Sequence, residues 1–167
     1  MIVCSRRGRL IFWAIKPILD LLRYVLYRFG MTAWPDNLAV VQVRVARPTD
    51  KLEEVIAFYR DCLGLRELYR FSGHAGFDGI MLGLPDATYH LEFTAHVDGS
   101  PCPAPSADNL LVLYFAGETA MYEVVQRLGE AGHEPVESEN PYWAENAGMT
   151  FEDPDGWRLV LMPRPVL

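Results

Sequence analysis

The sequence predicts an α+β fold of two tandem β-α-β-β-β modules, whose mixed sheets form a cup with the helices outside. An internal repeat is the first reason, because residues 79–86 and 148–155 share Gly, Pro and Asp at an offset of 69 residues. The same offset aligns two helical segments without a gap, so one unit occurs twice. The second reason is the hydrophobic period, which in each unit changes from two to about 3.6 and back to two.

The first module is expected at about residues 38–97. A β-branched run at 40–46 alternates as a strand does, and an amphipathic helix follows and ends at Gly64. The apolar face of this helix consists of residues at helical spacing, namely Leu52, Val55, Ile56 and Tyr59. Three shorter strands are expected near 65–71, 78–84 and 88–95.

The second module is expected at about residues 109–164, after a Pro- and Ser-rich linker at 98–108. Its first strand covers residues 110–115, and its helix ends at Gly132. The apolar face of this helix consists of Met121, Val124, Val125 and Leu128. Three further strands are expected near 134–138, 148–152 and 157–162.

Residues 1–36 are predicted to be a basic, apolar extension outside the globular domain at 37–167. Lys16, Asp20 and Arg23 interrupt its apolar run and argue against a transmembrane helix. These three residues share one helical face, which would suit an amphipathic helix on a membrane surface. The alternative is an upstream extension from a misplaced start codon, because Met31 stands just before the globular pattern. Membrane contact is therefore expected only if residues 1–30 belong to the natural protein.

Composition and charge narrow the classes of partner. Residues 1–30 hold six basic residues and one acidic residue, and their net charge of +5 leaves −12 for the rest of the chain. An acidic domain without a basic stripe is not expected to bind nucleic acid. The three cysteines are an odd number without C-x-x-C spacing, which favours a reducing cytoplasm as the location. Either a monomer or a homodimer is compatible with these observations.

Strand alternation predicts which side chains face the cup of the first module. In the first strand, the valines are expected to face the helix, which turns Gln42 and Arg44 toward the cup. In the last strand of this module, His90 and Glu92 alternate with apolar residues and are expected on the same side. One wall of the cup is therefore expected to be polar.

The second module is expected to supply a mostly apolar wall. The side chains predicted to face the cup are Leu111, Leu113, Arg158, Val160 and Met162. Tyr142 and Trp143 lie on a loop that is expected at the cup rim, where aromatic residues often clamp a ligand. The alternative is that Tyr142 and Trp143 close the core of the domain itself.

Three short segments resemble the vicinal oxygen chelate superfamily. This group includes glyoxalase I, extradiol dioxygenases, methylmalonyl-CoA epimerases, and the fosfomycin and bleomycin resistance proteins. Residues 56–59 with 63–65 resemble its first helix and the exit from that helix, and residues 153–156 resemble the turn before its final strand. Residues 89–93 resemble the strand that supplies a metal-binding glutamate. The resemblance implies the paired-module fold described above.

The resemblance also implies a divalent metal held by up to four cup residues, a His or Gln and a Glu in each half. Gln42 and Glu92 match these positions in the first half, whereas Leu111 and Val160 stand at them in the second half. Aliphatic side chains cannot coordinate a metal, and a catalytic site needs about three protein ligands. No cofactor is therefore expected. If a metal does bind, its ligands are expected to be Gln42, His90 and Glu92.

The leading functional hypothesis is a protein of this type that binds a small organic ligand in its cup without a metal. A sequestering, resistance-type role would suit it, because binding requires no catalytic residues. The alternative is a glyoxalase- or epimerase-type lyase or isomerase, or a dioxygenase, with Glu92 as the catalytic general base. A third hypothesis is a non-catalytic interaction scaffold.

Overall fold

The computed structural model describes residues 40, 42–84 and 89–165. The expected extension at residues 1–36 lies outside these described residues. Both predicted modules lie in one compact unit, Val41–Val166. Within the described part of the chain, no helix is long and apolar enough to cross a membrane.

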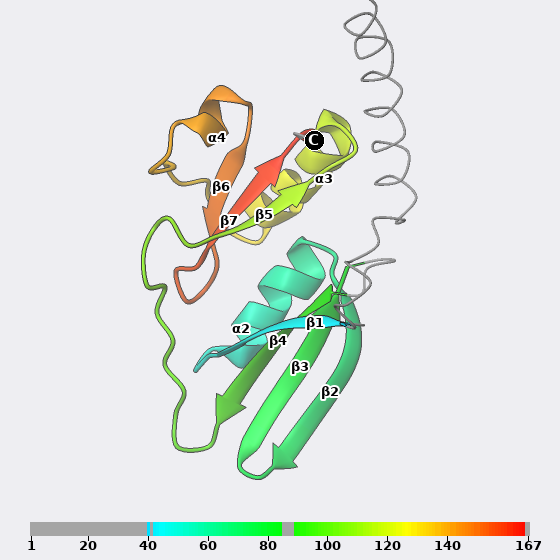
Figure 1. Cartoon of the computed structure of the whole chain (residues 1–167), viewed down its shortest axis with the longest axis vertical. Coiled ribbons are helices and arrows are strands. Elements are labelled where there is room, and N and C mark those ends of the chain that lie inside the picture. The colour runs from blue at the N-terminus through cyan, green and yellow to red at the C-terminus, as the bar shows by residue number, and fades with distance from the viewer. Residues whose placement is uncertain (1–39, 41, 85–88, 166–167) are drawn as a thin grey trace, which may run out of the picture. The chain divides into compact units, whose positions relative to one another are not determined.

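The first module is a four-stranded mixed sheet with one helical segment (Figure 1). Its strands follow the order β1-β4-β3-β2, in which β1 is parallel to β4 and the other neighbours are antiparallel. The helical segment starts as an α-helix and continues without a break as a π-helix. The elements are β1 (Val43–Pro48), α2 (Leu52–Ile56), η1 (Ala57–Cys62), β2 (Arg66–His74), β3 (Phe77–Gly83) and β4 (Tyr89–His96).

The second module repeats this order with a three-stranded sheet, β5-β7-β6, in which β5 and β7 are parallel. Its elements are β5 (Leu110–Tyr114), α3 (Glu118–Glu130), α4 (Tyr142–Glu145), β6 (Met149–Glu152) and β7 (Arg158–Met162). The strand expected at 134–138 is reduced to a single bridge between Val136 and Thr150. Pro135 precedes the bridge and has no N–H to donate to a longer ladder.

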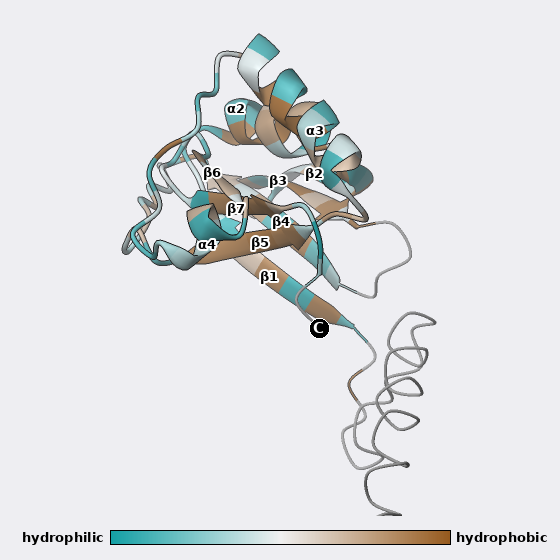
Figure 2. Cartoon of the chain, turned by 90° about the horizontal axis from the view of Figure 1, so that it is seen from above, coloured by the Kyte–Doolittle hydropathy of each residue, from teal (hydrophilic) through white to brown (hydrophobic). Residues whose placement is uncertain are grey.

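One hydrophobic core joins the two modules. Figure 2 shows α2 and α3 on the same side of the strands, with their apolar residues directed toward the sheets. The helix residues predicted from the repeat are buried in this core, including Val55 and Tyr59 from the first module and Met121 and Leu128 from the second. The structure therefore confirms the predicted fold class, with paired modules and the helices on one face.

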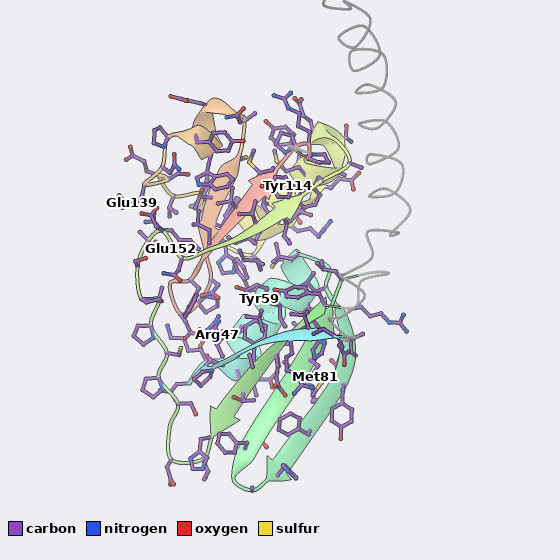
Figure 3. The ribbon with its side chains drawn as sticks, in the orientation of Figure 1. Arg47, Tyr59, Met81, Tyr114, Glu139 and Glu152 are labelled. Carbon is purple, nitrogen blue, oxygen red and sulfur yellow. The ribbon has the colours of Figure 1, made fainter. Side chains whose placement is uncertain are left out.

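Polar contacts join the modules where β1 meets the turn between β6 and β7. The Arg47 guanidinium donates to the carboxylates of Asp153 and Asp155, and the Tyr59 hydroxyl donates to Asp153 at 2.9 Å. Figure 3 shows Arg47 and Tyr59 close to one another. Burial, together with the negative charge of Asp153, raises the pKa of Tyr59 far above its usual range. We call Arg47, Tyr59, Asp153 and Asp155 the junction network.

Candidate functional site

The strand register brings the polar residues of the first module onto one face of its sheet. Arg44 of β1 lies opposite His90 of β4, and Met81 of β3 lies opposite Glu92 of β4. The neighbouring residues Leu91 and Phe93 belong to the helix-side core, so His90 and Glu92 point to the other side. As predicted, Arg44, His90 and Glu92 therefore share the face of the sheet that is turned away from α2.

Arg44 holds the other two polar side chains together. Its Nε donates to His90 Nε2 at 2.9 Å, and its Nη1 donates to Glu92 Oε2 at 3.0 Å. His90 and Glu92 are buried, with 3% and 9% of their surface exposed, whereas the Arg44 side chain is 45% exposed. We call these three residues the Arg44 cluster.

The Arg44 contact also selects one tautomer of the neutral His90 ring. A nitrogen that accepts a hydrogen bond carries no proton, so the neutral imidazole has its proton on Nδ1. This Nδ1 atom is buried and has no hydrogen-bond partner among the described residues. A buried donor without an acceptor costs about 1–3 kcal/mol, so this atom is a candidate partner for a buried water molecule.

An apolar surface lies beside the Arg44 cluster. Tyr69 and Phe71 of β2 stack at 6.3 Å between ring centroids, with an angle of 28° between their planes. Gly79 of β3 leaves room for the Phe71 ring, because a Cβ atom at this glycine would lie 2.4 Å from Phe71 Cζ. A cavity of about 510 Å³ opens here, and the residues that line it are Tyr69, Phe71, Ser72, His74 and Glu92.

The donor set of this face does not fit a divalent metal. The expected ligand atoms His90 Nε2 and Glu92 Oε2 both accept hydrogen bonds from Arg44, and Gln42 is exposed ahead of β1. Within the described residues, no group of three or more His, Cys, Asp and Glu side chains could hold a metal ion. A catalytic site needs about three protein ligands, and the Arg44 guanidinium already occupies one donor atom each of His90 and Glu92.

The predicted orientation of Leu111 and Leu113 is wrong. These residues lie opposite Leu159 and Leu161 of β7 and pack against the helix-side core. The residues of β5 on the cup side are therefore Leu110, Val112 and Tyr114. The repeat offset fails here by one residue, and a one-residue shift moves every side chain of a strand to the other face.

The predicted cup residues of β7 do face away from the helices, but the chain itself covers them. Arg158, Val160 and Met162 alternate with the core residues of β7, and Val160 and Met162 are 0% and 1% exposed. The Met162 sulfur and the Trp143 carbonyl both lie close to Gly148, so the segment around α4 packs on this face. The part of the expected apolar wall that β7 supplies at Val160 and Met162 is therefore closed.

Tyr142 and Trp143 belong to this covering segment. Their rings contact edge to face at 5.2 Å, and Tyr142 is 38% exposed. Trp143 Nε1 is buried without a partner among the described residues. The burial of the Trp143 indole nitrogen favours the alternative in which these aromatic residues close the core of the domain itself.

Sequence reasoning missed several residues around these sites. Tyr69 and Phe71 are two residues apart in β2, so strand alternation places both side chains on one face of the sheet, and the register shows that this is the face of Glu92. The contact between Arg47 and Asp153 joins residues more than 100 positions apart, and no local pattern signals it. A second cavity of about 270 Å³ lies near this contact, lined by apolar residues of β1, β4 and β5 together with Arg47, Tyr59 and Trp157.

Comparison with known proteins identifies the family of this chain. Residues 43–94 match the model of the YycE-like N-terminal domain, and residues 108–163 match that of the YycE-like C-terminal domain. The uncharacterized protein YycE of Bacillus subtilis (strain 168) is 50% identical over 126 residues, which are 75% of this chain and 90% of YycE.

Two solved structures extend the comparison. A YycE protein of unknown function from Bacillus subtilis has a TM-score of 0.76 and 44% identity, with 81% of this chain and 98% of that chain covered. Glyoxalase I of Leishmania major has a TM-score of 0.55 and 18% identity, with 72% of this chain and 84% of that chain covered. The second likeness shows the fold alone.

Proposed function

The chain belongs to the YycE-like family of the vicinal oxygen chelate superfamily, and from this premise we propose that it binds a small organic molecule at the Arg44 cluster without a metal. The hydrogen bonds from Arg44 to His90 Nε2 and Glu92 Oε2 carry this proposal. The guanidinium supplies a permanent positive charge beside two residues that could otherwise serve as metal ligands. The neighbouring cavity of about 510 Å³ is within the size range of small-molecule sites.

Binding without catalysis suits the state of Glu92. Glu92 accepts from Arg44 through Oε2, and in this proposal its other oxygen accepts a hydrogen bond from the ligand rather than removing a proton. The second module contributes mostly apolar side chains on its cup side, and the proposal assigns no acid, base or nucleophile to them. Sequestration of a ligand requires only the recognition surface that the first module provides.

Metal analysis tests the metal-independent part of the proposal. Protein purified without a chelator or an affinity tag should contain far less than one zinc, nickel, manganese or iron atom per chain. Close to one metal per chain, lost on Glu92→Ala, would contradict the proposal.

A ligand screen tests the binding part. Compounds found by ligand-observed NMR with the full chain should bind more weakly to Arg44→Met and Glu92→Gln. Arg70→Met is the matched control, because Arg70 is 40% exposed and pairs with Glu53 of α2 and Glu67 of β2, away from the Arg44 cluster. Ligands that bind all of these proteins equally would place the site away from the Arg44 cluster.

A further inference from the structure

We infer that the Arg44 cluster recognises a neutral carbonyl group with an adjacent N–H, as in a carboxamide, lactam or imide, attached to a flat apolar body. This inference rests on the proposed function, because it takes the Arg44 cluster to be the ligand site. It adds the chemical class of the ligand, which follows from the hydrogen-bonding groups that the cluster leaves unused.

Arg44 offers the donors for a carbonyl oxygen. A guanidinium has five N–H groups, and Arg44 directs one each to His90 Nε2, Glu92 Oε2 and the Met81 sulfur. Among the described residues, the two remaining N–H groups, one on each terminal nitrogen, have no acceptor. Because the side chain is 45% exposed, a ligand can reach them.

Glu92 offers the acceptor for an N–H group. Its Oε2 is bound to Arg44, whereas Oε1 has no hydrogen-bond donor within the described part of the chain. Oε1 is not among the fully buried unpartnered atoms, and Glu92 lines the cavity. Free donors and a free acceptor therefore stand side by side, in the complementary arrangement to an amide edge.

The charges of the pair select against ionised ligands. Arg44 and Glu92 carry opposite charges 3.0 Å apart, so the pair has no net charge. A carboxylate would meet the like charge of Glu92 and bring no N–H group, whereas an amidinium would meet the like charge of Arg44 and bring no acceptor. An amide satisfies both partners without leaving either charge opposed.

His90 and the aromatic residues complete the recognition surface. His90 accepts from Arg44 Nε and so acts as a positioning residue that fixes the plane of the guanidinium. The stacked rings of Tyr69 and Phe71 line the same cavity and offer flat apolar surface. A ring attached to the amide group would pack against them.

Three compounds of nearly the same shape test the inference, namely benzamide, benzoate and benzamidine. Binding to the full chain is measured by NMR titration at neutral pH. Wild-type protein should bind benzamide about two- to fivefold more tightly than either ion, since charge contacts that solvent partly screens contribute roughly 0.5–1 kcal/mol each. Arg44→Met should shift the preference toward benzamidine, and Glu92→Gln should shift it toward benzoate.

Two further variants serve as controls. Arg44→Lys keeps the charge but loses the planar fork, so benzamide should bind more weakly without a reversal of the charge preference. Arg70→Met should bind all three compounds as wild type does. A thermal melt of each variant establishes that it is folded.

The outcomes separate this inference from the proposed function. A wild-type preference for benzoate or benzamidine that disappears in Arg44→Met would contradict the amide inference but keep the Arg44 cluster as the ligand site. If none of the three compounds binds, but a compound from the screen binds more weakly to Arg44→Met, the amide inference is likewise contradicted and the Arg44 cluster remains the ligand site. If the three compounds bind every variant equally, both the inference and the proposed function are wrong.

Discussion

Replacing Arg47 with Met should cost far more stability than the same change at Arg44. The Arg47 side chain is only 11% exposed, and its partners Asp153 and Asp155 are 0% and 8% exposed. Removal of one partner of a buried ion pair strands the remaining charge, which costs about 3–5 kcal/mol. Arg44 is 45% exposed, so solvent screens its contact with Glu92 and its loss should cost clearly less than the loss of Arg47.

The assay is urea unfolding with a parallel thermal melt of wild type, Arg47→Met and Arg44→Met. For a domain of this size, about 2–4 °C per kcal/mol gives a fall in Tm of roughly 6–20 °C for Arg47→Met. Methionine retains apolar contact with Phe93 and Trp157, whose rings lie 4.9 and 5.3 Å from the Arg47 guanidinium carbon, so packing loss stays small. A Tm for Arg47→Met within about 2 °C of wild type would refute the reasoning, whatever Arg44→Met does.

Two further predictions concern a glycine of the cavity and the buried tyrosine. Gly79→Ala should destabilise the protein by about 1–3 kcal/mol, because the new Cβ meets the Phe71 ring. Gly129→Ala in α3 is the control, since its Cβ meets nothing within 4 Å and alanine should stabilise the helix by up to about 1 kcal/mol. Urea unfolding measures both, and equal effects would contradict this account. Burial raises the pKa of Tyr59 in the folded protein, whereas the unfolded chain has a tyrosine pKa of about 10. The Tyr59 hydroxyl therefore contributes fully to the free energy of unfolding below about pH 10, and this contribution declines as the pH rises above that value. Tyr59→Phe should lower the free energy of unfolding by about 1.5–3 kcal/mol at pH 8, and it should also reduce the loss of stability between pH 8 and pH 10.5. Urea unfolding at the two pH values measures both effects. If the variant loses as much stability at pH 10.5 as wild type does, Tyr59 is not the source of that loss.

The polar half of the cup could be predicted because polarity alternates along its strands. His90 and Glu92 stand between Tyr89, Leu91 and Phe93, so one face of β4 had to be apolar and the other polar. The same logic applied to β1 placed Arg44 on that face. The hydrogen bonds that join all three residues required the register, which only the structure supplies.

The second module could not be oriented in the same way. Residues 110–113 are Leu, Leu, Val and Leu, so both faces of β5 are equally apolar and no pattern distinguishes them. The repeat offset was the remaining guide, and it slipped by one residue between the helix and the strand. The cover over Val160 and Met162 was also beyond local reasoning, because it comes from the segment around α4.

The shared core restricts substitutions on the helix side of both sheets more than substitutions on the opposite side. Their helix-side residues pack against each other in one cluster, so a change of volume in one module has to suit its counterpart as well as its own neighbours. The sides of the sheets turned away from the helices lie outside that constraint. After a gene duplication, drift would therefore keep the buried halves of the two copies alike while the outer faces diverged, one into a charged recognition surface and the other into a mostly apolar one. New specificities in this lineage should accordingly arise from changes on β1, β2 and β4, without repacking of the interior.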